Sequence, residues 1–208
     1  MSTPVFHLLA GPNGAGKSTL YGALVASGSI AANIEFVNAD LYEQSHLQHI
    51  ADPQQRSVAA RKWADKRREE LLAAGQEFVS ETVFSHESKL RLISHAQSAG
   101  FSVVLYVVSV EDPARLLVRV RQRVKEGGHN VPPARIVDRY PRAMANLKQA
   151  VLLADVSFVY DAIDIEEGGH TLVALCEKGQ PNTLIAPLPL WAATLLNQAG
   201  CAHSTPTS

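Results

Sequence analysis

The sequence predicts an α/β fold: a mainly parallel sheet of about five strands, with helices on both faces and a helical, arginine-rich lid. Three observations lead to this prediction. Short β-rich apolar runs alternate with longer helical patterns, which is typical of βαβ units. Several of the short runs are continuously apolar, as strands covered on both faces are. The first run leads directly into a glycine-rich loop that begins a helix.

The expected strands are short runs rich in β-branched and aromatic residues. They span residues 5–10, 34–38, 77–81, 102–109 and 156–162, and a further strand is expected at 170–178. The clearest helices begin at a cap or a proline and end at glycine. They start at residue 17 and span 52–75 and 112–128, and a short helix is expected near 189–199 after a proline-rich passage.

Length and composition limit the classes of protein that are compatible with the chain. The chain has 208 residues, 46% of them apolar, so we expect one domain over 1–200 and a disordered tail at 201–208. A net charge of −1 makes nucleic acid the less favoured partner. Two distant cysteines suit a reducing compartment, and neither a signal peptide nor a membrane-spanning run is evident. These features predict a cytoplasmic protein with no membrane association.

A phosphate-binding loop follows the first expected strand. Residues 11–18, GPNGAGKS, match the P-loop pattern G-x-x-x-x-G-K-[ST]. The glycines allow backbone N–H groups to point inward, and the following helix adds its positive end. We expect Lys17 to reach the β- and γ-phosphates as a catalytic residue and Ser18 to hold Mg²⁺. The predicted nucleoside triphosphate site comprises Gly11, Pro12, Asn13, Gly14, Ala15, Gly16, Lys17, Ser18 and Thr19.

Other classes of P-loop protein require motifs that this chain lacks. A transporter-type ATPase needs an L-S-G-G-Q signature and an apolar strand ending in Asp-Glu, and a GTPase needs N-K-x-D. Neither set is present in the sequence. A small P-loop kinase domain remains as the best interpretation of residues 1–200, with a nucleoside triphosphate as the donor and an alcohol as the acceptor.

Two carboxylates follow expected strands, and the ends of parallel strands meet at the edge where ligands bind. Asp40 follows the second strand in EFVNAD and is the candidate base for an acceptor hydroxyl. Glu81 closes the third strand in EFVSET and could orient the acceptor or act through Mg²⁺-bound water. The alternatives are a helix N-cap for Asp40, before Leu41, and a solvated strand end for Glu81.

Arginines concentrate in residues 113–147, which we expect to form a lid over the phosphates. A first helix places three of them on one face and apolar residues on another, and a second helix repeats the pattern. The two sets are Arg115, Arg119, Arg123 and Arg135, Arg139, Arg142. Gly127-Gly128 would be the hinge, and Arg123 and Arg139 are the catalytic candidates. The alternative is a solvated basic face with i,i+4 partners. Adenine contacts are expected around Tyr160 and Asp161.

Taken together, the motifs resemble the zeta-toxin family over roughly residues 5–160. The resemblance rests on LLAGPNGAGKSTL, VNAD, SETVFS, YVVS and GGHNVPPARIVDRY…NL, in that order. It implies a nucleotide-kinase-like P-loop fold and an ATP- and Mg²⁺-dependent kinase. Characterised toxins of this family phosphorylate the 3′-hydroxyl of the sugar in UDP-N-acetylglucosamine, and an antitoxin protein blocks their nucleotide site. The resemblance therefore implies a nucleotide sugar as acceptor and an antitoxin as partner.

Transferred by position, the resemblance makes Asp40 the base and places Glu81, Thr82 and His129 at the acceptor. The chain departs from the toxins at two positions. Val83 stands where they carry a sugar-gripping threonine, and His129 stands where they carry a phosphate-clamping lid arginine, a charge that Arg139 or Arg123 could supply. Two other functions stay open: a polynucleotide or RNA end kinase, suggested by the basic helices, and a non-catalytic ATP-binding interaction module.

Overall fold

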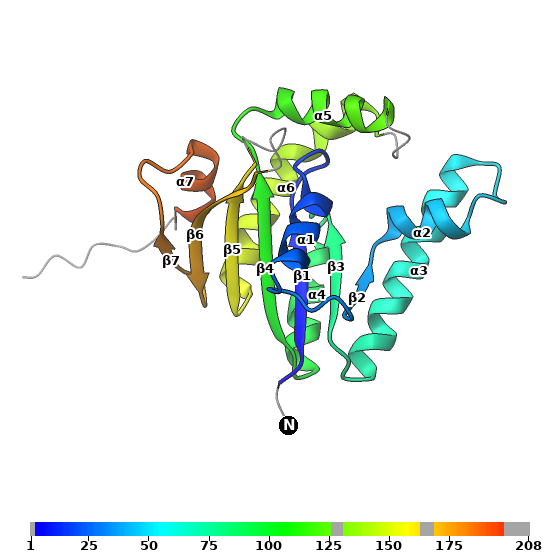
Figure 1. The fold of residues 1–208 in the computed structure, drawn as a ribbon, viewed down its shortest axis with the longest axis horizontal. Helices are drawn as coiled ribbons and strands as arrows, with labels where there is room; N and C mark the ends of the chain where they lie inside the picture. Colours follow the sequence, from blue (N-terminus) through cyan, green and yellow to red (C-terminus); the bar gives the residue numbers. More distant parts are fainter. Residues whose placement is uncertain (1–2, 126–130, 163–168, 198–208) are drawn as a thin grey trace, which may run out of the picture.

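A single seven-stranded sheet forms the centre of the molecule in the computed structural model, which describes residues 3–125, 131–162 and 169–197 (Figure 1). The strand order is β2-β3-β1-β4-β5-β6-β7; the first five strands are parallel and the last two join antiparallel. The strands are β1 (Val5–Ala10), β2 (Glu35–Val37), β3 (Phe78–Thr82), β4 (Ser102–Ser109), β5 (Val156–Asp161), β6 (Thr171–Glu177) and β7 (Gln180–Thr183). The predicted α/β class with a mainly parallel sheet is confirmed.

The helices follow the caps and prolines of the sequence. They are α1 (Lys17–Ala26), α2 (Ala39–His46), α3 (Pro53–Ala73), α4 (Ser88–Ser98), α5 (Pro113–Lys125), α6 (Pro133–Leu153) and α7 (Leu190–Leu196). Asp52 caps α3 by accepting from the N–H groups of Gln54 and Gln55. α6 continues through Pro141, which lies inside it. Within the described residues no helix has the length and apolar character needed to cross a membrane.

Every predicted strand lies within one residue of an observed strand at each end, but sequence analysis missed β7. All four side chains of β7 are exposed, so the strand has no apolar pattern to detect. It pairs with β6 through a tight turn in which Lys178 (φ 48°) and Gly179 (φ 77°) both have positive φ. The prediction also left α4 unnamed. The predicted tail 201–208 and the predicted hinge Gly127-Gly128 lie outside the described residues.

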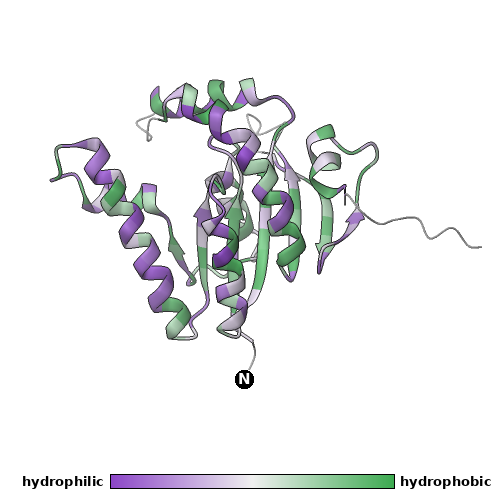
Figure 2. Ribbon diagram, turned by 180° about the vertical axis from the view of Figure 1, so that it is seen from behind, coloured by the Kyte–Doolittle hydropathy of each residue, from purple (hydrophilic) through white to green (hydrophobic). Residues whose placement is uncertain are grey.

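Helices cover both faces of the sheet, as expected, and alternate side chains of the strands form two cores. Phe6 and Leu8 of β1 belong to the core under α3, α4, α6 and α7, whereas Leu9 belongs to the core under α1 and α5. Figure 2 shows mostly hydrophobic central strands and a mostly hydrophilic α3. Buried Leu147, Ala150 and Val151 of α6 belong to the first core, and partly buried Met144 packs against it, so the end of the predicted lid region 113–147 is part of a core helix.

The sheet order places the functional segments around one edge. β1 lies between β3 and β4, and all three strands run parallel, so their carboxyl ends lie together. Leu9 is in register with Glu81 on one side and with Tyr106 on the other. Helix α5 lies across this edge, and α2 and α3 stand beside β2 (Figure 1). The loop after β1 therefore emerges between Glu81 and α5.

Candidate active site

The loop between β1 and α1 adopts the backbone conformation that its glycines allow. Gly14 (φ 84°) and Gly16 (φ 89°) are left-handed, and a Cβ on Gly14 would lie 2.6 Å from the carbonyl oxygen of Leu116 in α5. Gly16 is the N-cap of α1 and provides no side-chain cap. The first N–H groups of α1 are therefore left for another acceptor, which is the arrangement that binds phosphate.

Glu81 lies at the centre of a polar network beside this loop. Its Oε1 lies 3.5 Å from Nζ of Lys17, which also donates to the carbonyl of Pro12 at 3.1 Å. Its Oε2 accepts from Ser18 Oγ at 3.0 Å and from Asn38 Nδ2 at 3.1 Å. Because β3 is the direct neighbour of β1, Glu81, the second-last residue of β3, contacts the first two residues of α1.

Ser18 and Glu81 fit a magnesium site. A hydroxyl and a carboxylate oxygen 3.0 Å apart are hard oxygen donors, and they lie beside the lysine that would meet the phosphates. Mg²⁺ binds to proteins through one or two such groups together with phosphate oxygens and water. The predicted metal residue, Ser18, thus has a carboxylate beside it.

A cavity of about 500 Å³ lies between the loop and α5. One wall is the phosphate-binding loop with Glu81, and the other is a single face of α5. Its lining residues are Gly14, Gly16, Lys17, Ser18, Thr19, Glu81, Val118, Arg119, Gln122 and Arg123. The cavity is large enough for the polyphosphate part of a nucleotide, and two arginines face the lysine across it.

Helix α5 presents these arginines because of its amphipathic pattern. Leu116 and Val120 are buried in the core that α5 shares with α1, so Arg119 and Arg123, one turn apart, face the cavity. Arg119 also donates through Nη2 to the carbonyl of Ala162, just after β5. Sequence analysis placed Arg119 and Arg123 on the same face of the predicted lid but chose only Arg123 as a catalytic candidate. It did not single out Gln122.

Arg139, the other predicted lid arginine, is not among the residues that line the cavity. It is half-buried on α6, and partial burial lowers the pKa of its guanidinium, as do the charges of Arg135, Arg61 and Arg142. Because Arg61 belongs to α3, this effect indicates that Arg139 lies near α3. Of the two catalytic arginine candidates, Arg123 therefore lines the cavity and Arg139 does not.

Asp40 lies in the first turn of α2, half-exposed. The alternative interpretation of Asp40 as the helix cap is wrong, because Asn38 is the N-cap and accepts from the N–H of Leu41 at 3.1 Å. The residues that line the cavity do not include Asp40. Asn38, the N-cap two residues before Asp40, donates to Glu81 and so connects the start of α2 to the phosphate-binding loop.

The predicted acceptor residues have different positions. Thr82 closes β3, and its carbonyl accepts from the N–H of Gly11 at 3.3 Å, so its backbone supports the start of the loop. Val83 is half-exposed beside it. His129 lies outside the described residues.

His170 is a residue near the site that sequence analysis missed. It precedes β6, and the pKa of its ring is lowered by burial and, to a smaller extent, by the charge of Arg119, while the backbone of Gly16 acts in the opposite direction. The chain brings it there because β6 turns back antiparallel beside β5. In the sequence His170 was only the first residue of the strand expected at 170–178, and a lone histidine there carried no signal of a site.

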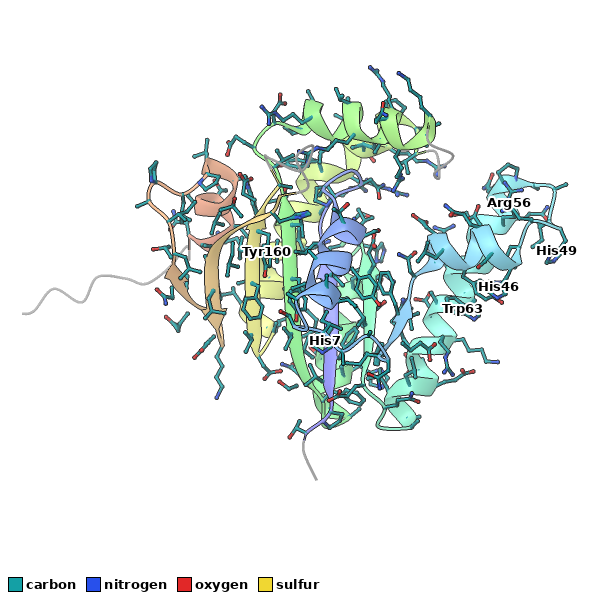
Figure 3. The ribbon with its side chains drawn as sticks, in the orientation of Figure 1. His7, His46, His49, Arg56, Trp63 and Tyr160 are labelled. Atoms are coloured by element: carbon teal, nitrogen blue, oxygen red, sulfur yellow. The ribbon has the colours of Figure 1, made fainter. Side chains whose placement is uncertain are left out.

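Of the two residues expected to contact adenine, Tyr160 and Asp161, the second is already bonded to another part of the protein. The Asp161 side chain is buried and accepts from the indole Nε1 of Trp191 at 3.0 Å, so it holds α7 to the sheet. Tyr160 lies on β5 over the sheet (Figure 3), and burial raises the pKa of its hydroxyl.

Comparison with known proteins gave one family and several similar folds. The family model described as Zeta toxin matches residues 1–173. A structure from the PezAT chromosomal toxin–antitoxin system of Streptococcus pneumoniae is 16% identical, with a TM-score of 0.61 over 82% of this chain and 71% of that chain. No curated protein matches.

Two further structures support the fold. The structure of AvrRxo1-ORF1:-ORF2 with ATP is 20% identical, with a TM-score of 0.66, and covers 88% of this chain but only 61% of that chain. A putative kinase from Chloroflexus aurantiacus is 17% identical, with a TM-score of 0.54 over 68% of this chain and 80% of that chain. At these identities the similarity establishes the fold alone.

Proposed function

The chain belongs to the Zeta toxin family of P-loop kinases, and we propose that it transfers the γ-phosphoryl group of ATP to a hydroxyl of a small molecule. The proposed acceptor is a nucleotide sugar such as UDP-N-acetylglucosamine. The observation that carries the proposal is the cavity in which Lys17, Ser18 and Glu81 face Arg119 and Arg123. A triphosphate bound in the cavity would have Lys17 and the metal site on one side and the two arginines of α5 on the other.

The ATP phosphates would occupy the loop. The N–H groups at the start of α1 would bind phosphate oxygens, and Lys17 would move from Glu81 to the β- and γ-phosphates. Ser18 and Glu81 would hold Mg²⁺, which neutralises phosphate charge when bound. Arg119 and Arg123 would neutralise the charge that develops on the transferred group.

Asp40 is the proposed base. It would take the proton of the acceptor hydroxyl as that oxygen attacks the γ-phosphorus and the bond to the bridging oxygen of ADP breaks. The products are ADP and a phosphate ester, and the proton leaves Asp40 to solvent. Its place at the start of α2 supports this role, because the N-cap of that helix is bonded to Glu81.

The charge near Arg139 supports an anionic acceptor. Burial lowers the pKa of Arg139, and so do the charges of Arg135 and Arg142 on α6 and of Arg61 on α3, while Asp138, which pairs with Arg142, acts in the opposite direction. Arginines of α3 and α6 therefore lie near one another around Arg139. The diphosphate of a nucleotide sugar would neutralise such a group of cations. Val83 lies next to Thr82 in place of the toxin threonine, so the sugar itself could differ from that of the toxins.

The test is direct phosphorylation. The purified protein is incubated with ATP, Mg²⁺ and UDP-N-acetylglucosamine, and the mass of the sugar nucleotide is measured. We expect a gain of one phosphate that is lost in Lys17→Ala and Asp40→Asn, with ATP binding kept only in Asp40→Asn. The matched controls are Lys62→Ala on the exposed side of α3 and Asp52→Asn, which keeps the α3 cap.

Either of two outcomes would redirect the proposal. An unchanged sugar with ATP still bound would move the search to other alcohols, including RNA ends. Absence of transfer to any alcohol would favour the non-catalytic ATP-binding module. We also propose a cytoplasmic location and a protein antitoxin as partner, the latter because a structural relative comes from a toxin–antitoxin system.

A further inference from the structure

Asn38 is a buried polar residue with two different hydrogen bonds. It is 6% exposed and lies between β2 and α2. Its Oδ1 accepts from the N–H of Leu41 at 3.1 Å, and its Nδ2 donates to Oε2 of Glu81 at 3.1 Å. The Leu41 N–H can only donate and an ionised carboxylate can only accept, so the orientation of the amide is fixed by its neighbours.

These bonds form a continuous path from the phosphate-binding loop to the helix that carries Asp40. Ser18 Oγ donates to Glu81 Oε2, the same oxygen accepts from Asn38, and Asn38 caps α2. An amide is suited to this position because it supplies an acceptor and a donor at once. Aspartate can also cap a helix but has no hydrogen to donate to Glu81, and the serine hydroxyl, although it can donate, is on a side chain too short to cap α2 and reach Glu81.

In the structure Glu81 contacts Lys17, Ser18 and Asn38. Binding of ATP and Mg²⁺ would change this network. If Lys17 turned to the phosphates and Ser18 to the metal, Asn38 would be the neighbour of Glu81 that keeps its hydrogen bond. The orientation of Glu81 toward the metal and the position of α2 would then depend on one amide.

We infer that Asn38 is a positioning residue that couples the metal side of the site, through Glu81, to the base Asp40 on α2. The metal part of this inference stands on the geometry alone, and the part that concerns Asp40 rests on the proposed kinase function. The alternative is that Asn38 only caps α2, in which case its bond to Glu81 has no effect on the metal or on turnover.

The test separates the cap from the bond to Glu81. Asn38→Ser keeps a good N-cap but is too short to reach Glu81, and Asn38→Ala removes both bonds. Asn33→Ser, at an exposed asparagine before β2, is the matched control. For each variant the Tm, the ATP affinity at a series of Mg²⁺ concentrations, and kcat and KM with UDP-N-acetylglucosamine are measured.

Asn38→Ser is expected to keep its Tm within about 2 °C of the parent, because the cap is retained. It should need about tenfold more Mg²⁺ for the same ATP affinity, while its affinity without Mg²⁺ stays within about twofold. Its kcat should fall about tenfold or more with little change in KM for UDP-N-acetylglucosamine. Asn38→Ala should show the same changes together with a Tm lower by several degrees.

The inference is overturned if Asn38→Ser matches the parent in Mg²⁺ dependence, or if its defects appear only in proportion to a loss of Tm. A double variant adds a second criterion. If Asn38 acts through Glu81, Asn38→Ser should cause little further change in the Glu81→Gln background, and additive effects would contradict the coupling. The ATP titrations need no acceptor, so they test the coupling even if the parent phosphorylates nothing.

Discussion

Lys17 and Glu81 form an ion pair inside the phosphate-binding loop, with Nζ 3.5 Å from Oε1 and side chains that are 5% and 16% exposed. The carboxylate therefore holds the lysine at the place where a phosphate would bind. In the proposed function, ATP would exchange this contact for its own, and Mg²⁺ would bind the carboxylate that is released. The ion pair would thus link nucleotide binding to Mg²⁺.

Glu81→Gln should bind ATP more tightly than the parent in the absence of Mg²⁺. The neutral amide neither competes for Lys17 nor repels the phosphates, so we expect a gain of about three- to tenfold. The enhancement of affinity by Mg²⁺ should shrink in the same variant. Calorimetric titration of ATP with chelator and with Mg²⁺ measures both. The control is Glu69→Gln on the exposed side of α3; unchanged metal-free affinity in Glu81→Gln would indicate that Glu81 only supports the loop.

Arg123→Ala should weaken ATP binding about tenfold, because it removes a charged donor from the wall that faces Lys17. Arg139→Ala should change ATP affinity less than about twofold, since Arg139 does not line the cavity. Arg121→Ala, at an exposed arginine of the same helix, is the matched control. Equal losses in Arg123→Ala and Arg139→Ala would show that α6 also closes over the phosphates.

Gly14→Ala should reduce ATP affinity by at least about tenfold, because its Cβ would lie 2.6 Å from the Leu116 carbonyl and φ is 84°. Either the loop or α5 must move. Gly22→Ala, inside α1, is the matched control: among the described residues, no atom outside the adjoining helix backbone lies within 4 Å of its added Cβ. That control should raise the free energy of unfolding by up to about 1 kcal/mol. ATP titration and urea unfolding of both variants check the pair; normal binding by Gly14→Ala would contradict a functional role for the close approach of the loop to α5.

The free energy of unfolding should fall as the pH is lowered below about 6.5. Burial lowers the pKa of His7, whose Nδ1 lies 3.1 Å from the Tyr106 hydroxyl, and burial also lowers that of His170. Between the lowered native pKa and the ordinary pKa, the unfolded chain binds more protons than the native protein. Stability therefore rises with pH across that window and is fully present above it.

Urea unfolding at pH values from about 5.5 to about 7.5, chosen to bracket about 6.5, measures this dependence. In His7→Gln the slope should be smaller than in the parent, because one of the two titrating groups is removed. His49→Gln, which changes an exposed histidine outside the helices, is the matched control. An equal slope in the parent and His7→Gln would assign the effect to His170 or to other groups.

The phosphate-binding loop and the strands were predictable because their signals are local. Left-handed glycines such as Gly14 and Gly16, a lysine at the start of α1 and continuous apolar runs act within a few residues of each other. β7 gave no such signal, because its exposed side chains follow no apolar alternation and its place depends on pairing with β6.

The sequence by itself determined the fold class and the phosphate-binding loop, and it singled out Glu81, which lies in β3, and Asp40, which lies in the first turn of α2. Only the tertiary structure decided how they meet. β3 lies beside β1 and β2 beside β3, so Glu81 contacts Lys17, Ser18 and Asn38 although more than forty residues separate it from each. Arg119 and Arg123 reach the cavity while Arg139 does not, because the packing of α5 and α6 against the cores sets which faces remain accessible. Contacts between distant segments depend on strand order and packing, which no local pattern specifies.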